Sequence, residues 1–346
     1  MSASPSRRGL TALAGGVTAL AAGAAYGVPA QAAGLAYVAL GDSYSSGVGT
    51  RAYLSDGTSC QRSVYAYPSL IAAARGYSLT FRACSGATSS DVSRTQLDAL
   101  TTSTRVVTLT VGGNDAGFAS VLTTCAAPSW LTNCTKAVDT AQAFIAGTLP
   151  ARLSALYSSI RTKAPNAVVV VSGYPRVFNG QDCNALTFFS PAEETRLNQT
   201  ADQLDGVIAA AAAATGVRYS SPTSAFVGHA VCGSPEWLNG LSNPVTDSYH
   251  PNRLGHASGY TPVVSTILGT PVAADTAVVR AAEAMAPELT AQSARYAARD
   301  ATVTPQPFVL PDLTTPQAKA AARAAGVDLS DPRSIRAADL RFAEVR

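Results

Sequence analysis

Charge is scarce in this sequence. Only 14% of its 346 residues are Asp, Glu, Lys or Arg, and the formal net charge is +3. Two of the basic residues, Arg7 and Arg8, lie close to the N-terminus, and without them the rest of the chain is nearly neutral. Nucleic-acid-binding proteins normally carry a basic face or stripe. We therefore expect no nucleic-acid partner.

Metal-binding patterns are also missing. The chain has three histidines, none at zinc-ligand spacing from a cysteine, and no Cys-x-x-Cys pair. Its carboxylates do not cluster at the spacing of a calcium loop. The sequence therefore predicts no metal site and no cofactor.

Beyond residue 32 no apolar run reaches the roughly 18 residues needed to span a membrane. The N-terminus itself has Arg7 and Arg8, a run of small and apolar residues over 9–25, and Ala30-Gln31-Ala32, which fits the small-x-small cleavage rule. We interpret residues 1–32 as a secretory signal peptide and expect a secreted, extracellular protein. The paired arginines leave both the general and the twin-arginine export routes open.

All six cysteines lie beyond this signal. Export and an even number favour three disulfides over free thiols or metal ligands. Fifteen pairings are possible in principle. We expect neighbours along the chain to pair, because each bond would then pin one long loop: Cys60–Cys84, Cys125–Cys134 and Cys183–Cys232.

Strand-like and helical patterns alternate along the chain. Apolar runs typical of buried strands occupy residues 35–40, 79–83, 105–111, 167–172 and 217–220. Helical patterns cover residues 65–74, 136–163 and 193–214, and a last helix is expected after Leu254. This alternation predicts an α/β fold with a parallel sheet covered on both faces. Right-handed crossovers would place every loop that follows a strand at one edge of the sheet.

Composition changes near Gly269. Residues 270–346 contain no Cys, His or Trp, are rich in alanine and are punctuated by prolines. Helices are expected over 273–299 and 317–325, with Pro305-Gln306-Pro307 as a linker. We therefore divide the chain into the signal peptide, a catalytic domain over 33–269 and a C-terminal extension over 270–346. Packing on the domain, cleavage, partner binding and weak order all remain open for this extension.

Ser43 is the first candidate for chemistry. It lies in residues 41–47, Gly-Asp-Ser-Tyr-Ser-Ser-Gly, directly after the first apolar run. Open α/β folds bind ligands just beyond the carboxyl ends of their strands. This position suits a nucleophile.

A serine nucleophile needs a base, and His250 is the best placed of the three histidines. It follows Asp247 by three residues, and Pro251 biases its backbone towards an extended conformation. The Asp247 carboxylate could then hold one ring nitrogen while the other faces Ser43. His229 has no acid near it in sequence, and His256 reads as a surface or structural residue.

Acyl transfer also requires donors for a developing oxyanion. Asn114 follows the third apolar run and carries an uncharged NH2 donor. Gly86 follows the second run, and its N–H is accessible because it has no side chain. Both residues would lie at the same sheet edge as Ser43.

In chain order these elements resemble the sequence blocks of the SGNH (GDSL-type) hydrolase family. The matching blocks are Gly41-Asp42-Ser43 with Gly47, Gly86, Gly112-x-Asn114-Asp115 and Asp247-x-x-His250-Pro251. Within the family, the six cysteines and Asp-Ser-Tyr-His-Pro-Asn look like the secreted lipases, esterases and phospholipase A1 enzymes of actinomycetes. The resemblance covers roughly residues 34–268.

The resemblance implies a three-layer α/β/α sandwich around a mostly parallel, five-stranded, flavodoxin-like sheet. It implies Ser43 as nucleophile and His250 as general base. The implied oxyanion donors are the N–H groups of Ser43 and Gly86 and the side chain of Asn114. Asp42 and Asp115 would orient turns. Some members hold the histidine with a backbone carbonyl, so either Asp247 or the Ser248 carbonyl would orient His250.

The expected site loops are apolar and aromatic, which suits an acyl chain better than a sugar. The residues concerned are Tyr44, Val48, Tyr53, Phe118, Trp130, Leu131 and Tyr249. We expect a monomeric enzyme that cleaves lipid carboxylic esters, most plausibly of phospholipids at an interface, through an acyl-Ser43 intermediate. The alternatives are a carbohydrate or small-molecule acetylesterase and a secreted binding module without activity.

Overall fold

The computed structural model describes residues 1–4 and 34–343. The interpretation of residues 1–32 as a signal peptide therefore falls, beyond residue 4, outside the described residues. Residues 34–343 form one compact unit.

A five-stranded sheet forms the centre of this unit. Its strands are β1 (Ala36–Ala39), β2 (Ser78–Phe81), β3 (Val106–Leu109), β4 (Val168–Ser172) and β5 (Arg218–Ser220). All neighbouring pairs are parallel, and the order is β2-β1-β3-β4-β5. The five apolar runs of the sequence are thus the five strands. The valine-rich composition of β3 and β4 follows from their burial on both faces.

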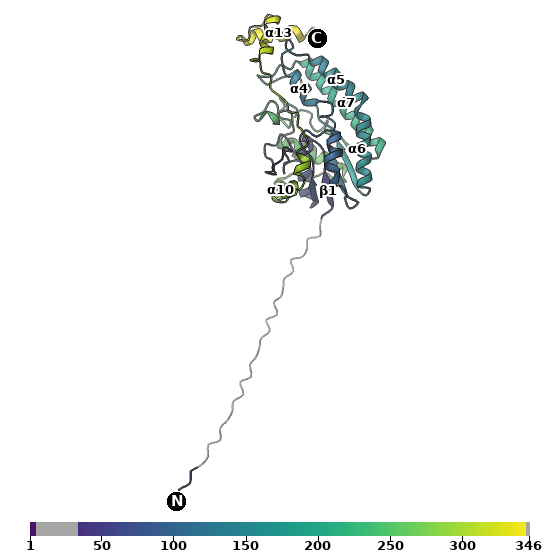
Figure 1. Cartoon of the computed structure of the whole chain (residues 1–346), viewed down its shortest axis with the longest axis vertical. Helices are drawn as coiled ribbons and strands as arrows, with labels where there is room; N and C mark the ends of the chain where they lie inside the picture. Colours follow the sequence, from purple (N-terminus) through teal and green to yellow (C-terminus); the bar gives the residue numbers. More distant parts are fainter. Residues whose placement is uncertain (5–33, 344–346) are drawn as a thin grey trace. The chain divides into compact units, whose positions relative to one another are not determined.

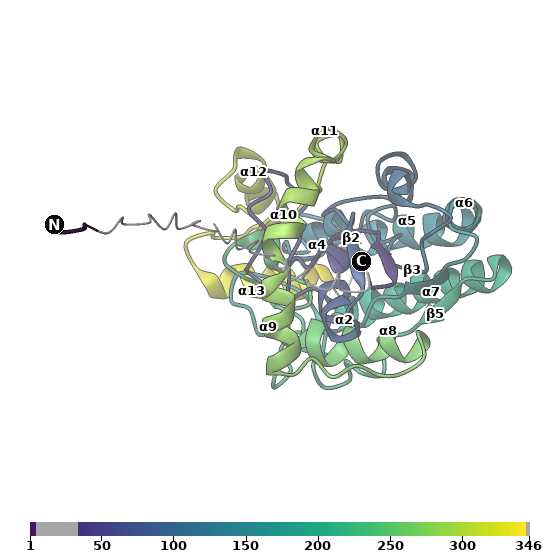
Figure 2. The same cartoon turned by 90° about the horizontal axis from the view of Figure 1, so that it is seen from below.

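Helices cover both faces of the sheet, so the domain is a three-layer α/β/α sandwich, as the resemblance implied (Figures 1 and 2). The helices on one side are α2 (Tyr67–Arg75) and α8 (Thr261–Ile267); those on the other are α5 (Cys134–Gly147), α6 (Leu149–Lys163) and α7 (Pro191–Thr215). The short α1 (Ser43–Ser46), α3 (Ser89–Asp91) and α4 (Phe118–Cys125) follow β1, β2 and β3.

Several expected helices are divided near a proline, which has no backbone N–H to donate. The single helix expected over 136–163 is two helices, α5 and α6, which meet at Thr148 because Pro150 occupies the first turn of α6. The helix expected after Leu254 begins with a π-helical turn over Gly255–Tyr260 and continues as α8.

The extension is also more broken than expected. Residues 273–299 form α9 (Thr276–Ala284), α10 (Ala286–Ala294) and the start of α11 (Ala297–Asp300), with Pro287 in the first turn of α10. Further on, α12 (Pro316–Ala325) was expected, whereas α13 (Pro332–Ala343) was not.

The extension packs on the domain, which is one of the roles that the sequence left open. Helix α9 lies against α2, and Gln292 of α10 is hydrogen-bonded to strand β2. Its side chain accepts from the Phe81 N–H at 2.9 Å and donates to the Leu79 carbonyl at 3.1 Å. Figure 1 shows the yellow-green chain running from α10 to α13 along the domain.

Asp300, at the end of α11, is the electrostatic anchor of the extension. Its carboxylate pairs with Arg62 at 2.6 Å and with Arg82 at 2.9 Å, and all three side chains are fully buried. The Arg82 guanidinium also lies 3.8 Å from the centre of the Tyr296 ring, a cation–π contact. Two domain arginines thus share one carboxylate of the extension.

The far end of the extension is held by a separate apolar cluster. Trp130 of the domain packs with Ala322 of α12 and with Ile335 of α13. Asp339 of α13 accepts a hydrogen bond from the Ser129 N–H at 2.6 Å. The extension is therefore attached on both sides of residues 301–315.

Three disulfides close loops of the domain: Cys60–Cys84, Cys125–Cys134 and Cys183–Cys232. These are the neighbour pairs expected from the sequence.

Replacing Asp300 with alanine should lower the free energy of unfolding by about 3–5 kcal/mol, because two buried guanidinium groups lose their shared counterion. Urea unfolding followed by tryptophan fluorescence measures this change. The matched control is Asp139→Ala, which breaks an exposed pair with Arg196 and should cost less than about 1 kcal/mol. Equal midpoints for Asp300→Ala and the unaltered protein would contradict the anchoring role.

Candidate active site

The turn after β1 fixes Ser43 at the first position of α1. Asp42 caps this helix by accepting from the Tyr44 N–H at 3.0 Å. Gly41 has φ +116°, and a Cβ there would lie 2.4 Å from the Thr110 carbonyl oxygen. Only glycine fits this combination of positive φ and close backbone approach.

Asp42 supports the turn rather than the reacting atoms. Its carboxylate also accepts hydrogen bonds from the Thr110 hydroxyl at 2.6 Å and from the Tyr174 hydroxyl. Burial raises the pKa of Asp42 to about 6, although these hydrogen bonds oppose the shift. This geometry agrees with the orienting role that the resemblance implied.

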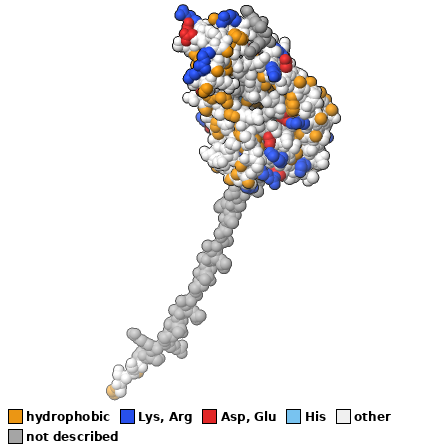
Figure 3. Space-filling view, turned by 45° about the horizontal axis from the view of Figure 1, so that its top comes forward, with side chains coloured by type: hydrophobic (Ala, Val, Ile, Leu, Met, Phe, Trp, Pro, Cys, Tyr) orange, Lys and Arg blue, Asp and Glu red, His pale blue; other side chains and the backbone are white. Residues whose placement is uncertain are grey.

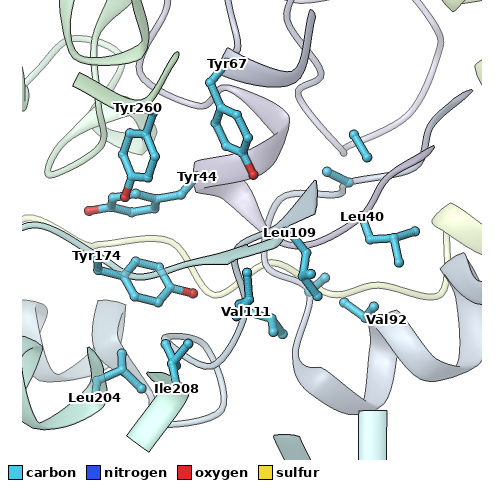
Figure 4. Packing of buried hydrophobic residues seen from close by; sticks show 14 of the residues in the cluster. Leu40, Tyr44, Tyr67, Val92, Leu109, Val111, Tyr174, Leu204, Ile208 and Tyr260 are labelled. Atoms are coloured by element: carbon cyan, nitrogen blue, oxygen red, sulfur yellow. The ribbon is translucent and has the colours of Figure 1, made fainter. Parts of the chain in front are cut away.

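Buried tyrosines surround the same turn (Figure 4). Tyr44 packs edge-on against Tyr174 and Tyr260, with ring centres 5.0 and 6.3 Å apart. Its hydroxyl donates to the Tyr249 carbonyl at 2.7 Å. The turn of Ser43 is thereby tied directly to the loop of His250.

His250 lies between Ser43 and its own loop. Its Nε2 is 2.9 Å from the Ser43 Oγ, and its Nδ1 is 2.8 Å from the Ser248 carbonyl oxygen. Burial lowers the pKa of His250 to about 4, because the charged imidazolium is disfavoured away from water. The ring is therefore neutral at ordinary pH and can accept a proton.

Asp247 does not hydrogen-bond to this imidazole. Its fully buried carboxylate accepts from the Tyr53 hydroxyl at 2.5 Å. Tyr249 has φ +60°, and in this turn the Ser248 carbonyl oxygen lies within hydrogen-bond distance of His250 Nδ1. Of the two partners that the sequence left open for His250, the structure places the carbonyl against the ring.

The other two histidines do not hydrogen-bond to Ser43. His256 is fully buried and accepts from the Tyr67 N–H at 3.3 Å, so it is a structural residue and not a surface one. Burial lowers its pKa to about 3. His229 stacks on Trp237 with ring centres 3.9 Å apart.

Gly86 and Asn114 line the same cavity as Ser43 and His250. Gly86 has φ +82°, and no described residue accepts a hydrogen bond from its N–H. The Asn114 side chain donates to the Ala87 carbonyl at 3.1 Å, which fixes its orientation. Asp115 binds the Ser89 N–H and hydroxyl at 2.7 and 2.6 Å and so joins two of the edge loops.

The cavity beside Ser43 measures about 420 Å³. Its interior is apolar and is built by α4, α5 and α7: Phe118, Ala119, Val121, Leu122, Ala141, Ile145, Leu197, Ala201 and Leu204. Residues 305–308 of the extension also line it. A cavity of this size and polarity accommodates an apolar ligand group.

The sequence predicted only part of this lining. Tyr44, Phe118 and Tyr249 do line the cavity. Val48, Tyr53, Trp130 and Leu131 are not among the lining residues; Trp130 instead packs under the extension. The helix residues other than Phe118 were missed because an apolar side chain facing a cavity has the same sequence pattern as one facing the core.

Charged side chains are sparse on the face shown in Figure 3, where apolar atoms are scattered among polar ones. Among the described residues, no helix combines the length and apolarity required to cross a membrane.

A profile of the GDSL-like lipase/acylhydrolase family matches residues 39–258. The chain belongs to this family. It is a carboxylic ester hydrolase of the SGNH type, as the four sequence blocks had indicated.

Relatives of this hydrolase are found among Streptomyces enzymes. Lipase 1 of Streptomyces coelicolor is 44% identical over 257 residues, which cover 73% of this chain and 92% of the relative. A lipase of Streptomyces rimosus is 42% identical over 231 residues, covering 66% and 85%. The crystal structure of phospholipase A1 from Streptomyces albidoflavus has a TM-score of 0.63 at 47% identity, covering 68% of this chain and 99% of that one.

Acid should weaken the fold partly through His256. Because its pKa in the folded state is about 3 and that of a free histidine is about 6.5, the unfolded chain binds a proton that the folded one does not. The stability that the neutral ring contributes is therefore complete above pH 6.5 and is lost as pH falls from about 6.5 towards 3. We expect the stability of the unaltered protein relative to His256→Gln to fall by about 1 kcal/mol per pH unit in this window.

Urea unfolding at pH 7, 6, 5 and 4 measures this difference. Asp42 acts in the opposite direction, since its raised pKa makes the folded state bind more protons between about 3.8 and 6. Its effect is common to both proteins and cancels in the comparison. A difference that stays constant with pH would contradict the expectation.

Proposed function

We propose that Ser43 is the nucleophile of an acyl transfer and that His250 is its general base. The 2.9 Å contact between His250 Nε2 and Ser43 Oγ carries this proposal. As Oγ attacks an ester carbonyl, Nε2 takes the hydroxyl proton, and the Ser248 carbonyl accepts a hydrogen bond from Nδ1–H of the resulting imidazolium. The imidazolium then protonates the departing alcohol.

Water completes the cycle. His250 removes a proton from a water molecule that attacks the acyl-Ser43 ester, and the carboxylic acid is released as Ser43 regains its proton. The negative oxygen of both tetrahedral intermediates would be stabilised by the N–H groups of Ser43 and Gly86 and by the side chain of Asn114. The unpaired Gly86 N–H and the fixed Asn114 amide support this assignment.

The substrates are lipid carboxylic esters, with phospholipids as the most favoured class. The apolar interior of the cavity suits a bound acyl chain, and the relatives include lipases and a phospholipase A1. Both observations support this assignment. An acetylesterase for carbohydrates would need more fixed polar groups along the cavity. A binding module without activity would not require the hydrogen bond between Ser43 and His250.

We further propose that residues 1–32 direct export and are removed, so that the enzyme acts outside the cell as a monomer on lipid surfaces. One relative of known structure is an extracellular lipase from Streptomyces rimosus, 42% identical to this chain. The paired cysteines agree with an oxidising compartment.

Ser43→Ala should lose about 10⁴-fold or more in kcat on p-nitrophenyl butyrate and on phosphatidylcholine vesicles, because no nucleophile remains. It should also lose labelling by a serine-reactive organophosphate, detected by mass spectrometry. The control is Ser59→Ala, since Ser59 is an exposed serine on the same cavity, and it should keep both activity and label. Hydrolysis restricted to acetylated carbohydrate would reject the lipid assignment.

Asp247→Asn should retain kcat within about tenfold, since the Ser248 carbonyl holds the ring and the new amide oxygen can still accept from Tyr53. A carboxylate that orients a catalytic histidine is worth about 10⁴ in kcat. Steady-state kinetics on p-nitrophenyl butyrate therefore separates the two roles. A loss near the larger value would show that Asp247 acts on His250.

A further inference from the structure

Part of the extension lines the cavity of the active site. Between α11 and α12, residues 303–309 run as Val-Thr-Pro-Gln-Pro-Phe-Val without regular secondary structure; we call this segment the strap. Four of its residues, 305–308, line the same cavity as Ser43 and His250.

The strap touches the two loops that flank the catalytic pair. A Cβ on Gly86 would lie 2.4 Å from the Pro305 Cα, so the strap backbone packs directly on this proposed oxyanion donor. On the other side the Phe308 ring packs edge-on against Tyr249, with ring centres 4.9 Å apart. Phe308 is 6% exposed. The strap therefore runs from the Gly86 loop to the His250 loop along the cavity.

Both ends of the strap are fixed to the domain. Upstream, Asp300 is held by the two buried arginines and Val303 is buried. Downstream, the Val309 N–H donates to the Thr123 hydroxyl of α4 at 2.9 Å, and α12 and α13 pack on Trp130. These contacts fix the strap at both ends beside the cavity.

The strap is not part of the region shared with the family. The family profile ends at residue 258. The phospholipase A1 structure is covered over 99% of its length by only 68% of this chain. The strap therefore lies beyond the part of the chain that the family profile matches.

We propose that the strap is a specificity-determining wall of the active site, in which Phe308 contacts the acyl chain of medium- and long-chain esters. This proposal rests on the proposed function of Ser43 and His250. An acetyl group ends beside Ser43, whereas a longer chain must continue along the apolar walls, of which Phe308 is one. The strap residues that line the cavity carry no charge, so they add apolar surface without a new polar requirement.

The test compares kcat/KM on p-nitrophenyl acetate and p-nitrophenyl decanoate, which share a leaving group and differ only in the acyl chain. Phe308→Ala should lower kcat/KM on decanoate about tenfold, within the range for lost apolar contact in a pocket, and should change acetate hydrolysis less than about twofold. Phe308→Leu retains an apolar wall and should recover most of the decanoate activity.

The matched control is Val309→Ala, the neighbouring residue, which is 57% exposed and does not line the cavity. This variant should have unchanged kcat/KM values on both esters. Thermal unfolding of each variant reports folding; if Phe308→Ala fails to fold, a decanoate-selective loss in Phe308→Val, intermediate between Leu and Ala, tests the same claim.

Three results would overturn the proposal. An equal fall on both esters would mean that Phe308 only supports the fold. A rise on both esters would mean that the strap is a cover that excludes substrate. Unchanged kcat/KM values on both esters would show that Phe308 does not contact the acyl chain. Absence of Ser43-dependent hydrolysis of every ester would instead defeat the proposed function itself.

Discussion

The hydrogen bond between Ser43 and His250 depends on a sheet that brings together residues 207 positions apart. Strand β1 delivers the serine to the edge where its neighbours also end, and the histidine loop returns to that edge after β5. The Tyr44 hydroxyl then joins the two turns through the Tyr249 carbonyl. Every other feature of the site is arranged around this contact: the Asp42 cap, the buried tyrosines and the Ser248 carbonyl.

Much of this site could be predicted from the sequence because its parts are local. The runs that form β1, β3 and β4 are largely buried and are therefore continuous in sequence. Ser43, Gly86 and Asn114 each lie three residues beyond the end of an apolar run, and His250 was recognised from the sequence of its own loop. Gly41 and Gly86 both have a positive φ. Glycine adopts such a conformation readily, so its presence in a turn is a local sequence signal. For the same reason the break between α5 and α6 could have been placed at Pro150, where the chain loses a donor.

Contacts between distant segments could not be predicted in this way. Asp247 stands at a spacing that suits either His250 or another donor, and only the folded loop directs it to Tyr53. The composition of the extension is that of a weakly ordered segment. Part of its attachment is the pairing of Asp300 with Arg62 and Arg82, which lie 238 and 218 positions earlier in the chain, and no local sequence pattern predicts such a contact.

The hydrogen bonds of Gln292 affect whether copies of this protein can associate through the edge strand β2. A carboxamide, like a peptide group, can both donate and accept, and Gln292 makes one hydrogen bond of each kind with the outer rim of β2, as a further strand would. An unpaired rim is a template on which a second polypeptide can add its own strand. Here Gln292 of α10 occupies that rim and so closes this route to aggregation.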